Sequence, residues 1–370
     1  MELNEILRVA AAAKSSDIHL KVGLPPIFRR DSQLFPYKEG GRLTAETIIQ
    51  MARDIMTPAQ RESFEADREI DMGYGVPGLG RFRLNVFQQR GTVGMVFRVI
   101  PMEINGIRDL DLPKVVEELA MEPRGLLLVT GTTGSGKSTT LASMIDYINQ
   151  KKTAHIITIE DPIEFLHRDK KSVINQREVG FDTLSFAGAL KSALRQDPDV
   201  ILVGEMRDFE TIETALVAAE TGHLVLSTLH TVDAAETIHR IISVFPPYQQ
   251  KQVRLQLASI IKGIVSQRLV PRADGRGRVP AVEVMVATAR VRDCIEVPEK
   301  TKEIRTAIAE GFTTYGMQTF DQSLMGLLKK NLVTYKEALR QSSNPDDFAL
   351  KMSGISSTSD ARWDMQEGKG

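Results

Sequence analysis

The spacing of hydrophobic residues changes character along the chain, with the change near residue 125. Before that point, stretches with helical spacing are mixed with stretches in which apolar and polar residues alternate. Helical spacing predicts helices at residues 3–10 and 44–56, and alternation predicts strands at 16–20, 82–86 and 93–99, the last two joined by a turn near 89–91. We therefore expect residues 1–100 to form an α+β domain with a largely antiparallel sheet.

A second helix start follows the helix predicted at residues 44–56. Thr57 has the side chain of an N-cap, Pro58 fits the first helical position, and Gln60 stands where a capping box needs a side chain that reaches back. These residues predict a new helix that begins at Pro58.

From residue 125 onward, short apolar runs alternate with helical patterns. The runs predict buried strands at residues 125–130, 155–159, 199–203 and 223–228. Alternation of this kind indicates a parallel sheet with crossover helices. The fold class expected for the whole chain is α/β, with the α+β domain first and the parallel-sheet domain second.

The remaining segments complete the expected organisation. Residues 101–124 are predicted to be a linker with a short helix at 113–120, and residues 125–353 the second domain. After Pro246 and Pro247 almost everything is expected to be helical, with one apolar stripe over Val253, Leu257, Ile260 and Ile264. Residues 354–370 are rich in Ser, Thr, Asp, Lys and Gly, which predicts a mobile tail.

Composition narrows the class of protein. The chain has 370 residues, of which 42% are hydrophobic and 26% charged, and a net charge of −1. A chain this long is expected to form two or three domains. The balanced charge argues against a dedicated nucleic-acid binder, because such binding depends on neutralising phosphates. A single cysteine, Cys294, excludes an intrachain disulfide and a cysteine-rich zinc site.

No feature predicts export or membrane insertion. The first residues lack the basic start and the apolar core of a signal peptide. No apolar run approaches the length of about 18 residues that spanning a bilayer requires. We expect a cytoplasmic protein that is not inserted in a membrane.

The most specific motif is the loop between the apolar run at residues 125–130 and the helix that follows it. Residues 131–138 read GTTGSGKS and match G-x-x-x-x-G-K-[ST], the phosphate-binding loop. Glycines leave room for backbone N–H groups to curl around a phosphate, and the start of the helix adds partial positive charge. The expected nucleotide contacts are Thr132, Thr133, Gly134, Ser135, Gly136, Lys137, Ser138 and Thr139.

Two residues of this loop have distinct expected roles. Lys137 should reach the β- and γ-phosphates, which also makes it a catalytic residue. The Ser138 hydroxyl should hold Mg²⁺. The sequence therefore predicts a site for a nucleoside triphosphate, ATP, with Mg²⁺.

Carboxylates follow two of the predicted strands. The run at residues 155–159 is followed by Glu160, Asp161 and Glu164, and the run at 199–203 by Gly204 and Glu205. Ligands of parallel sheets lie beyond the carboxyl ends of the strands, so these acids suit Mg²⁺ binding or activation of water. Gly204 occupies the position usual for the aspartate of a Walker B strand. We expect Glu205 to be the principal hydrolytic carboxylate and an Mg²⁺ ligand, directly or through water, with Glu164 as its partner; placement alone leaves either as the base.

Two histidines flank the apolar run at residues 223–228. His223 and His230 are an odd number of positions apart, so a strand would direct them to opposite faces, which argues against one shared metal ion. Imidazole can both donate and accept hydrogen bonds. We expect His230 to act in catalysis and His223 to contact the nucleotide or a neighbouring subunit; the alternative is a structural role for each.

The four motifs together resemble those of the type II and type IV secretion ATPases. GTTGSGKST, TIEDPIEF, DVILVGEMRD and ETGHLVLSTLHT stand in the order of the Walker A, Asp-box, Walker B and His-box motifs of that family. The resemblance extends from SDIHL near the N-terminus to GMQTFDQSL at residues 316–324. Four ordered motifs over about a hundred residues are highly specific.

The resemblance implies a fold, an assembly and an activity. It implies an N-terminal PAS-like domain, a C-terminal RecA-like ATPase domain with a helical end, and a homohexamer with ATP between subunits. Arg83 and Arg98, on the two strands predicted near the linker, are then expected to complete a neighbour's site as trans arginines. The implied function is a hexameric ATP-hydrolysing motor that powers retraction of type IV pili through a platform protein, at the cytoplasmic face of the inner membrane.

Two features bear on the branch of the family. Extension ATPases are longer and usually carry a four-cysteine zinc site, so a single cysteine favours the retraction branch. The hallmark segment of that branch appears at residues 303–311 as EIRTAIAEG, which keeps Arg305 and Glu310 but has Ala309 in place of a second arginine.

Other classes of function remain to be tested. A pilus-assembly or secretion ATPase of the same family is the nearest alternative. A RecA-like DNA motor predicts basic channel loops, which the balanced charge does not favour. A nucleotide-gated switch would bind ATP and barely hydrolyse it, and a small-molecule kinase is usually shorter.

Overall fold

The computed structural model describes residues 2–30, 33–101 and 103–352. The chain divides into two compact units. The first contains the residues up to Glu103 together with Asp161–His167 and Glu178–Asp182, and the second contains the rest of the described chain. The predicted mobile tail at 354–370 lies outside the described residues.

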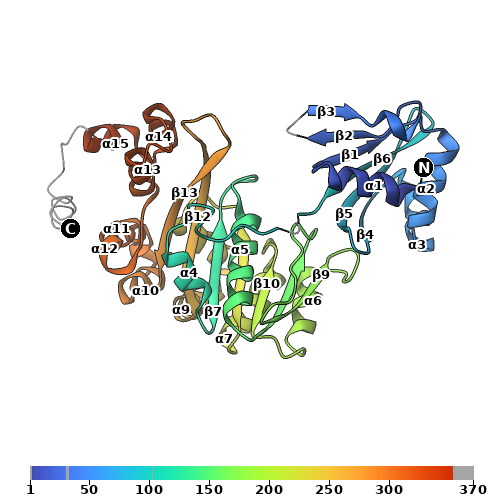
Figure 1. Ribbon diagram of the computed structural model, residues 1–370. Helices are drawn as coiled ribbons and strands as arrows, with labels where there is room; N and C mark the ends of the chain where they lie inside the picture. The colour runs from blue at the N-terminus through green and yellow to red at the C-terminus, as the bar shows by residue number, and fades with distance from the viewer. Residues whose placement is uncertain (1, 31–32, 102, 353–370) are drawn as a thin grey trace. The chain divides into compact units, whose positions relative to one another are not determined.

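The first unit is an α+β unit around an antiparallel sheet (Figure 1). Over the described residues the strand order is β3-β2-β1-β6-β5-β4, and each pairing is antiparallel. The expected helices, strands and turn are all present, whereas β2, β3 and β4 were not predicted. The elements are α1 (Leu3–Ala12), β1 (Asp17–Leu20), β2 (Ile27–Arg30), β3 (Gln33–Pro36), a 3-10 helix (Lys38–Gly40), α2 (Ala45–Ile55), α3 (Pro58–Asp67), β4 (Glu69–Val76), β5 (Gly80–Gln89) and β6 (Thr92–Val99).

Local sequence signals set the helix starts in this unit. The Thr57 side chain accepts from the backbone N–H of Gln60, and the Gln60 side chain accepts from the backbone N–H of Thr57. This is the predicted capping box, with Pro58 at the first helical position. It satisfies two N–H groups that a helix start otherwise leaves unpaired.

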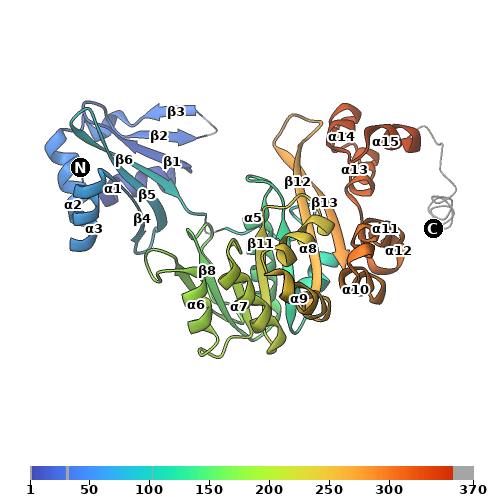
Figure 2. The ribbon, with the colours of Figure 1, turned by 180° about the vertical axis from the view of Figure 1, so that it is seen from behind.

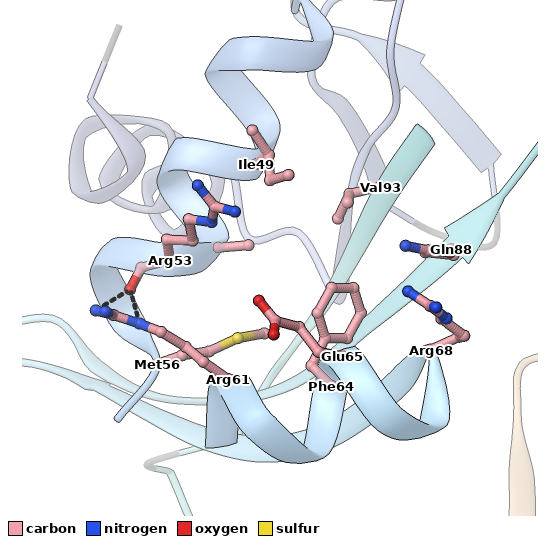
Figure 3. Close-up of a pocket in the computed structure, with 10 residues that line it drawn as sticks. Ile49, Arg53, Met56, Arg61, Phe64, Glu65, Arg68, Gln88 and Val93 are labelled. Atoms are coloured by element: carbon pink, nitrogen blue, oxygen red, sulfur yellow. Dashed lines mark hydrogen bonds between the residues drawn. The ribbon is translucent and has the colours of Figure 1, made fainter. Parts of the chain in front are cut away.

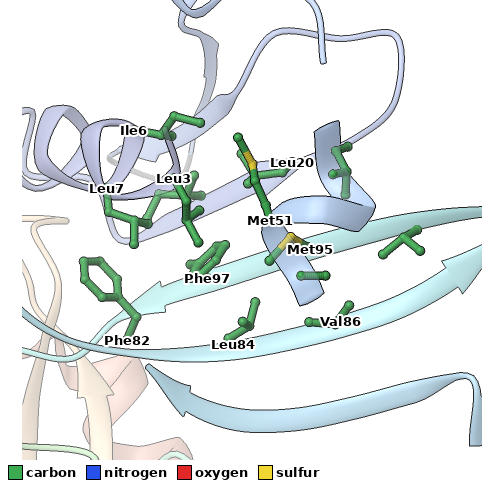
Figure 4. Packing of buried hydrophobic residues seen from close by; sticks show 14 of the residues in the cluster. Leu3, Ile6, Leu7, Leu20, Met51, Phe82, Leu84, Val86, Met95 and Phe97 are labelled. Atoms are coloured by element: carbon green, nitrogen blue, oxygen red, sulfur yellow. The ribbon is translucent and has the colours of Figure 1, made fainter. Parts of the chain in front are cut away.

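The core of the first unit lies between one face of the sheet and the helices (Figure 4). Strand β5 sends alternate residues into this core, and β6 does the same from the neighbouring strand. Burial of these side chains supplies the main stabilisation of the unit. The labelled members are Leu3, Ile6 and Leu7 of α1, Leu20 of β1, Met51 of α2, Phe82, Leu84 and Val86 of β5, and Met95 and Phe97 of β6.

The second unit is an α/β unit whose sheet has the described order β13-β12-β7-β11-β10-β8-β9. Strands β12, β7, β11, β10 and β8 run parallel, and β13 is antiparallel to β12. The four predicted strands correspond to β7, β8, β10 and β11. The strands are β7 (Gly125–Thr130), β8 (His155–Glu160), β9 (Val173–Glu178), β10 (Val200–Val203), β11 (Leu224–Leu229), β12 (Ile261–Pro271) and β13 (Arg278–Val286).

Helices cover both faces of this sheet. One face carries α4 and α5 (Figure 1), and the other carries α6 to α9 (Figure 2). The C-terminal helices α13 and α14 contact the β12–β13 hairpin. The bounds are α4 (Val115–Ala120), α5 (Lys137–Lys151), α6 (Phe186–Ala193), α7 (Phe209–Glu220), α8 (Ala234–Ser243), α9 (Pro247–Ile260), α10 (Ala289–Glu296), a 3-10 helix (Pro298–Glu303), α11 (Ile304–Glu310), α12 (Phe312–Tyr315), α13 (Phe320–Lys329), α14 (Tyr335–Gln341) and α15 (Pro345–Met352).

The expectation of an almost wholly helical segment after Pro247 is wrong. Helix α9 ends at Ile260, and the chain then forms the long hairpin β12–β13. Ile264, which the helical stripe included, lies in β12 beside Leu128 of β7. The reason is tertiary, because β12 extends the parallel sheet and buries its apolar residues there.

Within the described ranges, no helix is long and apolar enough to cross a bilayer. Cys294 is buried in α10.

Candidate functional site

The phosphate-binding loop connects the end of β7 to the start of α5. Gly131, Gly134 and Gly136 all have positive φ, which glycine adopts without a steric penalty. A Cβ on Gly131 would lie 2.5 Å from the Gln267 backbone oxygen and 2.5 Å from the Ser135 hydroxyl. Glycine at 131 therefore allows the loop to lie against β12 while it curls toward the helix.

The loop presents groups suited to phosphate. Thr132, Thr133 and Gly134 are exposed, whereas Ser138 and Thr139 are half-buried in the first turn of α5. The N-terminus of this helix favours an anion. The predicted strand, loop and helix are therefore assembled as the motif requires.

Two side chains of the loop point back into it. The Lys137 Nζ donates to the backbone oxygens of Gly131 at 2.9 Å and Thr132 at 3.1 Å, so its charge lies within the curl of the loop. The buried Ser135 hydroxyl has no hydrogen-bond partner within the described chain. A cationic group and an unpaired hydroxyl inside a glycine loop fit a bound phosphate and its metal ion.

Strand β12 supports the loop from the side, which the sequence did not predict. The Thr130 hydroxyl donates to Ser266 Oγ at 2.9 Å, and Gln267 Nε2 donates to the Thr140 hydroxyl at 2.8 Å. Gln267 and Ser266 are buried. Since β12 was expected to be helical, no sequence signal connected these residues with the loop.

Glu205, Arg207 and His230 meet at the same edge of the sheet. Glu205 follows β10 and His230 follows β11, and these are neighbouring parallel strands. The Glu205 Oε1 lies 2.6 Å from Arg207 Nε and 3.2 Å from His230 Nε2. The structure therefore brings together the two predicted residues Glu205 and His230.

The surroundings of Glu205 keep it ionised. Burial raises the pKa of its carboxyl group, but the hydrogen bond from Arg207 and the charges of His230 and Arg207 lower it more in sum. The resulting pKa lies below the ordinary value of 4.5. A carboxylate that is ionised at neutral pH can accept a proton or hold a cation.

Arg207 is a site residue that the sequence analysis missed. It stands two positions after Glu205 in the motif DVILVGEMRD. The available signal was the alternation of an extended segment, which places positions 205 and 207 on one side.

Hydroxyl groups of β11 fix the end of β10. The Ser227 hydroxyl donates to the Val203 oxygen and the Thr228 hydroxyl to the Gly204 oxygen, each at 2.7 Å. A Cβ on Gly204 would lie 3.2 Å from the Ile159 oxygen and 3.3 Å from the Glu160 Cα. This close packing against the end of β8 explains why glycine replaces the aspartate usual at this position.

Within this chain, His223 lies at the opposite edge of the sheet from the loop, and its expected contact with the nucleotide or a neighbouring subunit stays a prediction. Its backbone oxygen accepts from the N–H of Gly125, the first residue of β7, whereas the loop follows the last residue. A strand of this length separates the two edges by roughly 15–20 Å. The His223 Nδ1 is 2.9 Å from the Ala218 oxygen, which is a structural contact at the end of α7.

Glu164 is exposed and belongs to the first unit. Glu160 ends β8 in the second unit and accepts from the Thr158 hydroxyl at 2.6 Å. The partnership of Glu164 with Glu205 stays a prediction.

Arg83 and Arg98 lie directly opposite each other on β5 and β6. They occupy the face of the sheet that does not carry the core, since Phe82, Leu84 and Phe97 point inward beside them. Arg83 lies 3.7 Å from Asp71, and Arg98 donates to Asp17 at 2.9 Å. Their side chains are 45% and 70% exposed, so both guanidinium groups are available at the surface of this unit.

Arg81 is held differently from these two. It forms an ion pair with Glu178 at 3.2 Å, and its side chain is only 21% exposed. Its guanidinium group is therefore less accessible than those of Arg83 and Arg98.

A pocket of about 430 Å³ lies in the first unit between α2 and α3 (Figure 3). Its floor includes Met56, Phe64 and Val93, and charged side chains such as Arg53 and Glu65 surround it. None of the predicted site residues lines it.

No cluster of three or more His, Cys, Asp or Glu side chains able to hold a metal ion occurs in the part of the chain that the structure describes. The groups that fit Mg²⁺ are the Ser138 hydroxyl and the Glu205 carboxylate, together with phosphate oxygens. That donor set suits a cation that binds through few protein ligands and keeps several waters.

Comparison with known proteins gives consistent matches. Residues 97–355 match the family described as Type II/IV secretion system protein. The chain is 46% identical over 348 residues to the type IV pilus retraction ATPase PilT of Pseudomonas aeruginosa, covering 94% of this chain and 100% of the relative. It is 41% identical over 361 residues to the type IV pilus ATPase PilU of the same organism, covering 98% and 94%.

A solved structure matches over nearly the same length. The structure of the pilus retraction motor PilT with bound ADP superposes with a TM-score of 0.86 at 49% identity, covering 94% of this chain and 98% of that chain. The resemblance stated from the four motifs is thus confirmed.

Proposed function

Because the chain belongs to the family of type II/IV secretion system proteins and is an ATPase of that family, we propose that it is the motor that retracts type IV pili. The observation that carries this proposal is the match to PilT along the full length of that relative. The local geometry supports it. The loop at residues 131–138 follows β7 and the ionised Glu205 follows β10, so both lie beyond the carboxyl ends of strands in one parallel sheet.

In this proposal the loop binds ATP. Backbone N–H groups from Thr132 to Thr139 hold the phosphates, and Lys137 exchanges its two bonds to loop oxygens for bonds to phosphate oxygens. Ser138 and Glu205 would hold Mg²⁺, which would neutralise phosphate charge when bound. Lys137 contributes to catalysis because charge on the γ-phosphate is redistributed during transfer.

The hydrolytic residues are Glu205 and His230, with Glu164 as a second carboxylate. Glu205 accepts a hydrogen bond from the attacking water and orients it. His230 and Arg207 hold the Glu205 carboxylate through its Oε1 atom, which limits the directions it can adopt. In this proposal His230 senses the γ-phosphate, because its contacts change when that phosphate leaves.

We further infer a homohexamer in which Arg83 and Arg98 of one subunit complete the site of another. The support is their exposure on the face of the first sheet that does not carry the core. The ion pair of Arg83 with Asp71 lies at the surface and is easily exchanged, whereas Arg98 pairs with the buried Asp17. Loss of the γ-phosphate would release the contact between subunits and let the units reorient. The linker between domains 1–100 and 125–353 is proposed at residues 101–124, of which the residues from Ile104 onward belong to the second unit.

The names PAS-like for the first domain and RecA-like for the second are part of the same proposal. The antiparallel sheet with helices on one face, and the parallel sheet with helices on both faces, support them. The proposed location is the cytoplasmic face of the inner membrane, with a platform protein as partner and no nucleic acid.

Deletion of the gene in its host tests retraction. Loss of the motor should leave cells with excess surface pili that do not twitch, and a plasmid copy of the wild-type gene should restore both properties. Cells without pili would show instead that the protein drives pilus assembly.

A further inference from the structure

A buried row of polar side chains leads away from the nucleotide loop across the sheet. Thr130 on β7, Ser266 on β12 and Glu283 on β13 are register partners in turn. Their side chains therefore share one face. Thr130 donates to Ser266, and all three residues are buried, with Glu283 only 5% exposed. A carboxylate so deep in the unit needs a partner, because an unpaired buried charge is costly.

The partner of Glu283 is the start of α8. Glu283 Oε1 accepts a hydrogen bond of 2.9 Å from the backbone N–H of Ala234, the first residue of that helix. Negative charge is favourable at a helix N-terminus. Glu283 thus fixes the start of α8 to the sheet.

Helix α8 in turn makes hydrogen bonds to the two residues that follow His230. Thr231 Oγ1 lies 2.6 Å from Thr237 Oγ1, and the backbone N–H of Val232 donates to Glu236 at 2.9 Å. Thr237 and Glu236 both belong to α8. Helix α8 therefore holds Thr231 and Val232 through hydrogen bonds. The residue before them, His230, contacts Glu205.

Charged groups from several elements face Glu283 across a cavity of about 270 Å³. Asp233 comes from the start of α8, Arg268 from β12 and Arg305 from α11. Arg305 is in turn paired with Asp321 of α13 at 3.1 Å. The protonation of Glu283 changes the charge balance at a junction of the sheet, α8 and the C-terminal helices.

We propose that Glu283 is a positioning residue for ATP hydrolysis, which holds His230 against Glu205 by anchoring the N-terminus of α8 to β13. The inference rests on the ATPase activity and on the proposed role of His230, not on pilus retraction. It assigns no contact with ATP to Glu283.

Because Glu283 titrates, this positioning role should depend on pH. The pKa of Glu283 is raised to about 7, because burial and the charge of Asp233 raise it by more than the Ala234 N–H, Arg305 and Arg268 lower it. The ionised carboxylate accepts the Ala234 hydrogen bond more strongly than the neutral acid does. The anchoring is therefore strongest above the pKa.

The test is steady-state ATP hydrolysis by the purified full-length wild type and the Glu283→Gln variant between pH 6 and pH 8. Gln keeps the shape and an acceptor oxygen but cannot ionise. The ratio of wild-type to variant kcat should be near 1 at pH 6 and rise about fivefold by pH 8, since hydrogen bonds to charged acceptors are the stronger class. KM for ATP should change less than about twofold, because no uniform binding interaction is removed.

Two further variants complete the design. Glu283→Ala removes the acceptor and should lower kcat at both pH values, whereas the exposed Glu296→Gln is a matched control that should leave the ratio at 1. A kcat ratio for Glu283→Gln that stays constant with pH would overturn the inference. A wild type without ATP turnover would instead contradict the ATPase assignment, so the two failures are distinguishable.

Discussion

The Nε2 atom of His230 lies 3.2 Å from the Oε1 atom of Glu205, at the ends of the neighbouring strands β11 and β10. The contact depends on the register of these two parallel strands. The hydroxyl groups of Ser227 and Thr228 on β11 also donate hydrogen bonds to backbone oxygens at the end of β10. The pair is therefore held by the sheet and not by a loop alone.

Replacement of His230 should alter the pH dependence of hydrolysis. The charge and hydrogen bond of His230 help to lower the pKa of Glu205, so His230→Ala should raise that pKa. Activity needs the ionised carboxylate, and the acid-side loss of kcat should therefore move to higher pH. We expect kcat at neutral pH to fall roughly 10- to 100-fold, because the carboxylate is less well oriented.

A pH–rate profile of His230→Ala checks this result. His239→Ala is the matched control, since His239 is exposed on α8. An unchanged acid limb in His230→Ala would show that the contact has no influence on the hydrolytic carboxylate.

Gly204→Ala should destabilise the second unit. Its Cβ would lie 3.2 Å and 3.3 Å from backbone atoms of Ile159 and Glu160, which cannot move like a flexible side chain. We expect a loss of about 1–3 kcal/mol in the free energy of unfolding. The measurement is chemical denaturation of the full chain.

The matched control is Gly326→Ala in α13, where the new Cβ would meet no atom within 4 Å. That change should stabilise the helix by about 0.5–1 kcal/mol. Equal effects of the two substitutions would refute the steric account of Gly204.

The nucleotide loop and its strands were predictable from sequence because each depends on local signals. Positive φ at three glycines and an apolar run before the loop are properties of a few consecutive residues. The capping box at Thr57 is another local signal that the structure confirms.

The hairpin β12–β13 could not be obtained in this way. The apolar stripe through Ile264 fits a helix, and this segment forms a strand only because it pairs with β7. The dipeptide Asp274-Gly275 at the hairpin turn was the one local signal available. His223 and His230 flank one strand, so their places at opposite edges of the sheet followed from the predicted strand itself.

Arg83→Ala should abolish hydrolysis without loss of the fold. The ion pair with Asp71 is exposed and is worth about 0–1 kcal/mol, so the first unit should remain stable. A trans arginine contributes roughly 10³–10⁵ in rate in other NTPases. Arg42→Ala, another exposed arginine of this unit, is the control that should retain activity.

Mixed assemblies reveal whether Arg83 acts in trans. Inactive Arg83→Ala subunits mixed with inactive Glu205→Gln subunits should regain part of the turnover, because a shared site can combine the intact residue from each. Co-assembly of the two variants with no gain in turnover would place Arg83 outside a neighbour's site.

Glu283→Gln should change stability with pH in a defined sense. The carboxyl pKa is about 7 in the folded chain and its ordinary value is 4.5, so between these values only the folded state keeps the proton. Wild-type stability therefore falls as pH rises through this window, by about 1.4 kcal/mol for each unit of pKa difference. The variant avoids this loss, because the amide that replaces the carboxyl group does not ionise.

The measurement is denaturation of both proteins at pH 5 and pH 8. The free energy of unfolding of the variant, relative to that of the wild type, should be larger at pH 8 than at pH 5. A difference that is constant, or that has the opposite sign, would show that Glu283 is not held protonated by burial.

The most direct test of the account is phosphate release from ATP by the full-length wild type and by Glu205→Gln, with the exposed Glu213→Gln as control. The account predicts sustained release by the wild type and the control. It predicts a loss of roughly 100-fold or more for Glu205→Gln, with ATP still bound, as is typical when a positioned base is removed. Release by Glu205→Gln at the wild-type rate would contradict it.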